Sequence, residues 1–160
     1  MNVANRMSEE LTRIYGNRLR VRVCGLLQED GLVLLVNHAL PGRSAWWAPP
    51  GGGVEFGELL EDALRREFEE ETNLKITVGQ FAFGCEFLQD NLHAIELYFW
   101  VSRINGIMAA GQDPELALVT DARFMSMEEI NSLPREHVHS IFHIAHSAID
   151  LQQLKGFFRI

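Results

Sequence analysis

Residues 51–74 read GGGVEFGELLEDALRREFEEETNL, and the acids near the end of this stretch decide which kind of protein the chain can be. The part from residue 59 to residue 72 can form about four helical turns, at roughly 3.6 residues per turn. Glu69, Glu70 and Glu71 then fall in the last turn, where the helix dipole is negative and each acid costs roughly 0.3–1 kcal/mol. Because no neighbouring residue offsets this cost, we interpret the acids as part of a functional site.

Three of the glutamates share one side of the expected helix. Glu67, Glu70 and Glu71 are related as i, i+3 and i+4, so they fall within one arc. An apolar stripe beside them can pack on a sheet, and it consists of Leu60, Leu64 and Phe68. The carboxylates would then stand at the edge of that packed surface.

Such a cluster of negative charges needs a cation. Neighbouring carboxylates repel one another, and their pKa values rise unless a positive charge neutralises them. Mg²⁺ takes hard oxygen ligands in an octahedron and usually keeps waters and substrate phosphates among them. The carbonyl of Gly51 or Gly52 could join these ligands, since glycine lets the backbone approach closely. The stretch therefore predicts a site for a divalent metal.

Two further residues of the helix bear on this site. Arg66 can pair with Asp62 on the helix surface, an interaction worth a few tenths of a kcal/mol. It also adjoins Glu67 and lies two turns beyond Glu58, so it could instead bridge and orient the carboxylates. Asn73 stands where a left-handed residue closes the helix, and asparagine is the next most tolerant residue after glycine there.

Residues 52–74 resemble the Nudix box: Gly, five residues, Glu, seven residues, Arg-Glu, an apolar residue, any residue, Glu-Glu, any residue, Gly and an apolar residue. The matching residues are Gly52, Glu58, Arg66, Glu67, Phe68, Glu70, Glu71 and Leu74. Asn73 replaces the last glycine of the box, and we expect little effect on the chemistry because the backbone conformation is what matters there. The match covers 23 of the 160 residues, and so many fixed positions make it a specific signal.

This resemblance implies an α/β/α sandwich, in which a mixed β-sheet is packed between helices. It also implies hydrolysis of a diphosphate bond in a nucleoside diphosphate linked to another group, with Mg²⁺ or Mn²⁺ as cofactor. The metal ligands that it implies are Glu67, Glu70, Glu71 and the carbonyl of Gly51. In the catalytic set, Glu67 is a further ligand or the general base, Glu58 is a supporting carboxylate and Arg66 orients them. The metals would neutralise charge on the phosphate and activate a water that attacks phosphorus in line.

Two other classes of protein fit the same residues. Some family relatives bind a nucleotide or sugar nucleotide without turnover, and a structural protein could keep the fold around a decayed site. The intact Glu67, Glu70 and Glu71 favour the enzyme. Residues 87–93, FLQDNLH, lack the tyrosine or proline that some relatives with dinucleotide or ADP-ribose preferences carry shortly after the box.

Residues outside the box supply candidates for contact with a substrate. The expected substrate-binding residues are Arg43, Trp47 and Glu115. Trp46 and Trp47 could stack on a base or pack at the sheet edge, since large aromatic side chains often contribute to packing. An additional acid often completes such a site, and the candidates are Glu86, Glu96, Glu115 and Asp121.

The remaining chain predicts strands and short helices around the box. We expect a hairpin over residues 18–38, strands over 75–88 and 92–104, and a short strand at 122–127 with Ser126 as a helix cap. The first strand alternates Arg18, Arg20 and Arg22 with apolar residues, and we expect its cationic side to face solvent rather than substrate phosphates. A short helix begins at Ser8.

A last helix is expected from Pro134. Its core-facing stripe comprises Val138, Ile141, Ile144, Ala145, Ala148 and Leu151. His139, His143 and His146 follow one another at i, i+4 and i+7, which could bind a transition metal, but we favour a partly exposed helix surface.

Composition limits the class of protein. With 160 residues, 47% of them hydrophobic, we expect a single domain over residues 1–160. The net charge of −8 argues against long nucleic acids, so the expected partner is a small nucleotide-type substrate.

Cys24 and Cys85 suggest buried reduced thiols. The first residues lack the long apolar stretch of a signal peptide, and no apolar run approaches about 18 residues, so we expect a cytoplasmic protein without a membrane partner. A homodimer is possible, because many Nudix relatives are dimers.

Overall fold

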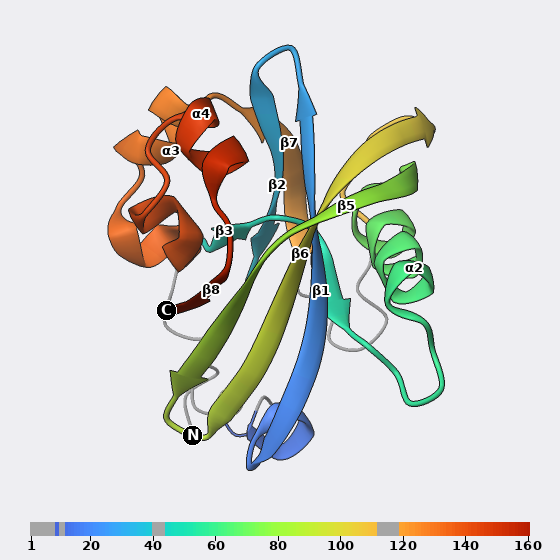
Figure 1. Ribbon diagram of the computed structural model, residues 1–160, viewed down its shortest axis with the longest axis vertical. Helices are drawn as coiled ribbons and strands as arrows, with labels where there is room; N and C mark the ends of the chain where they lie inside the picture. The colour runs from blue at the N-terminus through green and yellow to red at the C-terminus, as the bar shows by residue number, and fades with distance from the viewer. Residues whose placement is uncertain (1–8, 10–11, 40–43, 112–118) are drawn as a thin grey trace.

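The computed structural model describes residues 9, 12–39, 44–111 and 119–160 (Figure 1). The strands are β1 (Arg18–Glu29), β2 (Leu32–His38), β3 (Trp47–Ala48), β4 (Gly51–Gly53), β5 (Lys75–Gln89), β6 (Leu92–Asn105), β7 (Val119–Met125) and β8 (Phe157–Arg159). The helices are α2 (Leu60–Thr72), α3 (Met127–Ser132) and α4 (Ala148–Gln153), with 3₁₀ turns η1 (Arg135–His137) and η2 (Ser140–His143). The strands form a mixed sheet in the order β3-β2-β1-β6-β5-β8, while β4 pairs with β1 and β7 pairs with β2.

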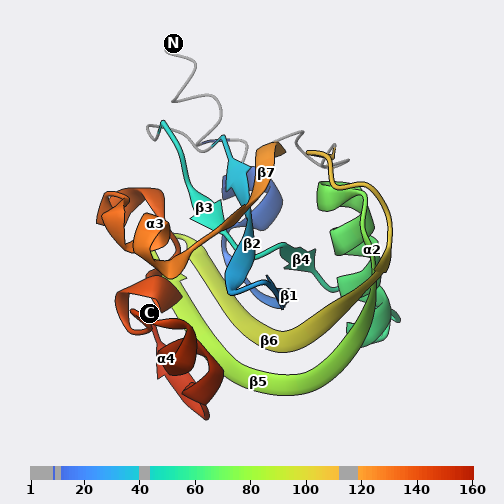
Figure 2. The same ribbon diagram turned by 90° about the horizontal axis from the view of Figure 1, so that it is seen from above.

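Helices cover the sheet from two sides. Figure 2 shows α2 on one side of β1 and β2 and the pair α3 and α4 on the other, with β5 and β6 curving between them. The expected mixed sheet packed between helices is therefore confirmed. In the described residues, no helix is long and apolar enough to cross a membrane.

Helix α2 is held against the sheet by its apolar side. Leu64 and Phe68 are fully buried, and burial of each side chain stabilises the fold by about 1.5–3 kcal/mol. Ala63 completes the buried stripe in place of Leu60, which is exposed. A Cβ atom at Gly25 of β1 would lie 2.3 Å from a ring carbon of Phe68, so a glycine is needed for the helix to approach this closely.

Strand β1 has different neighbours along its length. It runs parallel to β6 from Arg18 to Leu27, and only its last two residues pair with β2, next to the turn at Asp30 and Gly31. The expected hairpin is thus confirmed at its turn. Beside the middle of β1 runs β4, with Arg22 opposite Gly53 and Cys24 opposite Gly51. The glycines of the box are therefore part of the sheet.

The prediction that the arginines of β1 face solvent was wrong for Arg22. Leu19 and Val21 are 59% and 41% exposed, whereas the side chain of Arg22 is 23% exposed and lies on the inner side of the sheet. An acid on the neighbouring strand, Glu96, explains this orientation, because an inward arginine with an ion-pair partner is tolerated. Arg18 is exposed, as expected.

The continuous last helix was also a wrong prediction. The chain forms η1, η2 and α4 instead, because His139 and Ser147 adopt extended backbone conformations that interrupt the helix. Ser147 restarts it through a capping box with Asp150. The apolar stripe is still mostly buried, but Ile144 is exposed.

Two local predictions about helix ends can be compared with the structure. Ser126 and Glu129 form a capping box at the start of α3, as expected for the cap. Asn73 closes α2 in the left-handed conformation, with φ 59° and ψ 20°. The expected cap Ser8 lies outside the described residues, and the described part of that segment is helical at residues 12–15.

Candidate functional site

The acids of α2 lie directly against the glycines of β4. The N–H of Gly51 donates to Oε2 of Glu71 over 3.0 Å, and Glu71 is only 3% exposed. A Cβ atom on Gly52 would lie 2.3 Å from the carboxyl carbon of Glu67. The expected proximity of the box acids to residues 51–53 is therefore present, and it depends on the absence of a side chain at residue 52.

Arg66 occupies the centre of this arrangement. Its Nε and Nη2 donate to the two carboxylate oxygens of Glu58, each over 2.9 Å. Nη1 lies 2.8 Å from Glu67 and 3.3 Å from Glu70, and Nη2 also donates to the carbonyl of Gly53 over 3.1 Å. Arg66 thus bridges the carboxylates, while the surface pairing falls to Arg65, which binds Glu61 and Asp62.

The pKa values of the two acids that Arg66 contacts most closely are shifted in opposite directions. The hydrogen bonds from Arg66 lower the pKa of Glu58 below its ordinary value. Burial raises the pKa of Glu67, and the neighbouring Arg66 only partly reverses this effect. Glu67 is therefore the carboxylate of this group that takes up a proton more readily than an ordinary glutamate.

The residues present fit a divalent cation by their chemistry. Within the described residues, no three acid, histidine or cysteine side chains are grouped closely enough to form a ready metal site. Yet Glu67 and Glu70 approach the same nitrogen of Arg66, and Glu71 lies beside them against Gly51. Carboxylate and carbonyl oxygens are the donors that Mg²⁺ and Mn²⁺ prefer. The raised pKa of Glu67 is the response expected of a buried acid that a nearby cation would relieve.

His38 is a neighbour of the site that the sequence did not reveal. Its Nε2 lies 3.9 Å from Oε1 of Glu71. Burial, helped by the charges of Arg22 and His139, lowers the pKa of His38 to about 3. Glu71 therefore faces a neutral imidazole at neutral pH.

A second group of polar side chains lies on the inner side of β1 and β6, and we call it the Glu96 cluster: Arg22, Glu96, Tyr98 and His139. Glu96 accepts a hydrogen bond from the hydroxyl of Tyr98 over 3.0 Å, and its Oε2 lies 2.9 Å from Nε2 of His139. Nε of Arg22 lies 3.3 Å from its other oxygen. His139 is 4% exposed, so the expectation of an exposed histidine surface was wrong for this residue. His143 instead contacts the carbonyl of Arg135.

The Glu96 cluster predicts how stability depends on pH. Burial would raise the pKa of Glu96, but His139, Arg22 and Tyr98 together lower it to about 2. A carboxylate with a lowered pKa stabilises the fold above its ordinary pKa, and this contribution is lost as the pH falls from about 4.5 towards 2. We therefore expect the stability difference between the wild type and Glu96→Gln to shrink by about 1.4 kcal/mol between pH 6 and pH 3.5. Urea unfolding at both pH values measures it, and an unchanged difference would contradict the assignment.

The candidate substrate-binding residues have different outcomes. Arg43 and Glu115 lie outside the described residues. Trp47 is buried in the core beside β2, with the guanidinium of Arg123 4.5 Å from its ring centre, so its position matches the packing alternative. The ring of Trp46, by contrast, is partly exposed and lies between His38 and His139, at centroid distances of 5.6 and 5.4 Å.

The other candidate acids do not join α2. Glu86 pairs with His93 over 2.9 Å, and Asp121 lies 4.0 Å from Arg123 at an exposed position. Glu96 belongs to its own cluster. The additional acid of the site is therefore not identified by these described residues.

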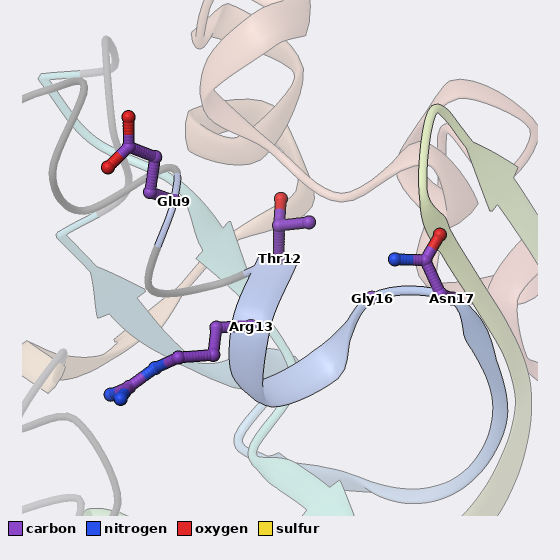
Figure 3. Close-up of a pocket in the computed structure, with 5 residues that line it drawn as sticks. All are labelled: Glu9, Thr12, Arg13, Gly16 and Asn17. Carbon is purple, nitrogen blue, oxygen red and sulfur yellow. The ribbon is translucent and has the colours of Figure 1, made fainter.

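A hollow of about 410 Å³ lies elsewhere on the molecule, before β1 (Figure 3). It is lined by Glu9, Thr12, Arg13, Gly16 and Asn17. None of these residues belongs to α2, β4 or the Glu96 cluster, so the hollow is not part of the candidate site.

Comparisons with known proteins agree with this geometry. The family model described as the NUDIX domain matches residues 16–146. Among curated proteins, the chain is similar to the nucleoside triphosphatase NudI of Escherichia fergusonii, with 50% identity over 64 residues, which are 37% of this chain and 43% of that protein. It is also 29% identical over 119 residues to the ADP-ribose pyrophosphatase of Methanocaldococcus jannaschii, covering 73% of this chain and 68% of that protein. The match to NudI thus spans less than half of the relative's length.

A similar solved structure is a NUDIX hydrolase from Nitrosomonas europaea. The two chains superimpose with a TM-score of 0.69 and 20% sequence identity, over 79% of this chain and 84% of the other. At this identity the likeness establishes a shared fold.

Proposed function

The chain belongs to the NUDIX family, and from this premise we propose that it is a divalent-metal-dependent hydrolase that cleaves a diphosphate bond in a nucleotide-type small molecule. Proteins of this family are typically dependent on divalent metals. Two relatives, a nucleoside triphosphatase and an ADP-ribose pyrophosphatase, support a nucleotide-type substrate.

One observation supports this proposal most directly. On α2, Glu67 lies against Gly52 and Glu71 accepts a hydrogen bond from Gly51. The guanidinium of Arg66 contacts three carboxylates, those of Glu58, Glu67 and Glu70. A solvated helix surface would not need a bare glycine opposite the Glu67 carboxylate. The arrangement concentrates hard oxygen donors at one place, which is what a phosphate-hydrolysing metal site requires.

We assign the metal ligands to Glu67, Glu70, Glu71 and the carbonyl of Gly51. A bound Mg²⁺ or Mn²⁺ supplies neutralisation of the phosphate charge and lowers the pKa of an attacking water. Arg66 positions the carboxylates, and its bonds to Glu58 and the carbonyl of Gly53 fix the start of α2 relative to β4.

Glu67 is our candidate for moving the proton. Its Oε1 accepts a hydrogen bond from Arg66, so Oε2 is the atom that we assign to receive the proton of the attacking water. Glu58, with its lowered pKa, stays ionised and keeps Arg66 in place.

The proposal is tested by incubating the purified chain with nucleoside triphosphates, ADP-ribose, nucleotide sugars and dinucleoside polyphosphates. The reactions contain Mg²⁺ or Mn²⁺ in ¹⁸O-labelled water, with an EDTA arm, and the products are weighed by mass spectrometry. We expect a metal-dependent product with one ¹⁸O on phosphorus, and its mass identifies the cleaved bond. If no substrate yields a product while one of them binds tightly, the chain is a nucleotide sensor instead.

A further inference from the structure

Arg22 lies next to the proposed metal site without belonging to it. On β1 it stands in register with Gly53 of β4 on one side and with Glu96 of β6 on the other. Its side chain points to the inner side of the sheet and is 23% exposed. Arg22 therefore lies between Gly53 of β4 and Glu96 of β6, and its side chain is partly buried there.

The donors of Arg22 are not used by the part of the chain that the structure describes. Its Nε lies 3.3 Å from Oε1 of Glu96 without forming a hydrogen bond, and no other hydrogen bond from this guanidinium to the described residues is found. Of the five N–H donors of a guanidinium, the one on Nε is buried here without a hydrogen-bond partner, and a donor withdrawn from water costs free energy until an acceptor meets it. Arg22 is thus built to receive an acceptor.

The acids around Arg22 favour its charged form. The negative charges of Glu96 and Glu71 act on Arg22, and Arg22 in turn acts on Glu67, so the guanidinium lies within electrostatic reach of the metal-site acids. Burial opposes its charge, yet these acids, Glu96 first among them, raise the pKa of Arg22 above its ordinary value. Arg22 therefore stays positive at every working pH.

A comparison of the two arginines of the site favours Arg22 as a ligand-binding residue. Arg66 is engaged by Glu58, Glu67, Glu70 and the carbonyl of Gly53. Its donors are consumed in positioning. Arg22 keeps its fork of donors, and Tyr98 and His139 hold the Glu96 carboxylate that anchors it.

We propose that Arg22 binds a phosphate oxygen of the substrate, and that Glu96 and His139 are positioning residues that hold its guanidinium beside the metal site. This inference rests on the proposed function, since it assigns a phosphate-binding residue for the same reaction. A planar guanidinium matches two oxygens of one phosphate, and a polyanion that enters a site rich in carboxylates gains from each fixed cation. Arg22 supplies such a cation from the sheet rather than from α2.

The test measures binding by calorimetry in the presence of Mg²⁺. The probes are inorganic tripolyphosphate and α,β-imido nucleoside triphosphates with adenine, guanine, cytosine and uracil, which resist hydrolysis at that bridge. We expect Arg22→Gln to weaken binding of all five probes by a similar factor, about 10-fold to 100-fold, as for the loss of charge-assisted hydrogen bonds. Arg22→Lys keeps the positive charge but loses the planar pair of donors, so its affinity for the probes should lie between those of the wild type and Arg22→Gln.

Two further variants separate binding from folding. Arg103→Gln removes another arginine of the same sheet, whose 2.7 Å ion pair with Glu29 is partly exposed, and it should leave all five dissociation constants unchanged. Glu96→Gln should raise KM severalfold and leave kcat within about twofold, because it loosens the Arg22 guanidinium without touching the reacting atoms. A lowered melting temperature is expected in either case, because Glu96 stabilises the fold, whereas a purely structural Glu96 would leave KM unchanged.

Several outcomes overturn the inference. Unchanged tripolyphosphate binding in Arg22→Gln, or in Arg22→Lys and Glu96→Gln if the first variant does not fold, removes it. A loss of affinity in Arg22→Gln that differs among the four bases shows that Arg22 contacts the base rather than the phosphate. If the wild type binds the probes through Arg22 but hydrolyses no substrate, the proposed function fails, while the assignment of Arg22 as a phosphate-binding residue remains.

Discussion

Glu70→Gln is expected to lower kcat for hydrolysis of the best substrate by at least about a thousandfold. The variant keeps the shape of the side chain but replaces an anionic metal ligand with a neutral amide, and the loss of about 4 kcal/mol of transition-state stabilisation corresponds to this factor. Glu70 is partly exposed and lies 3.3 Å from Arg66, so the fold should tolerate the change. Mn²⁺ binding, followed by electron paramagnetic resonance, should weaken in parallel.

The neighbouring residue provides a matched control. Glu69 precedes Glu70 in the same helical turn, but it is largely exposed and its ion-pair partner is Lys75, 3.9 Å away. Glu69→Gln makes the same chemical change outside the site, and it should alter kcat by less than about twofold. Equal metal affinity and equal activity in both variants would leave the chain as a structural protein with a decayed site.

The acids of α2 could be predicted from the sequence because they break a local rule. Glu67, Glu70 and Glu71 stand where a helix disfavours negative charge, and their spacing alone places them on one side of the helix. The bridging position of Arg66 follows from the same spacing, since it is flanked by the acids that it contacts. Local periodicity therefore determines most of this half of the site.

The Glu96 cluster could not be predicted in this way, because its members come from distant parts of the chain. Arg22, Glu96 and His139 are brought together by the parallel pairing of β1 with β6 and by the extended segment after η1, where Val138 pairs with Trp47. The alternation in β1 shows which residues share a side, but it does not show which side faces inward when the acid partner is on another strand. The i, i+4, i+7 spacing of the histidines suggested one helix, whereas burial of His139 against Glu96 bends the backbone away from it.

Gly52→Ala is expected to lower kcat by about a hundredfold to a thousandfold while the protein still folds. The added methyl group would lie 2.3 to 2.4 Å from the carboxylate of Glu67, which is the movable end of a flexible side chain, so the carboxylate is displaced instead of the backbone. A shift of about 1 Å in a catalytic group is enough for an effect of this size. Steady-state kinetics and the melting temperature measure the two consequences separately.

Gly53→Ala is the control, because its Cβ atom would meet only the end of Arg20 at 3.1 Å, and kcat should remain within a few fold of the wild type. If Gly52→Ala retains full activity, Glu67 does not need its contact with β4, and its assignment as metal ligand and base fails.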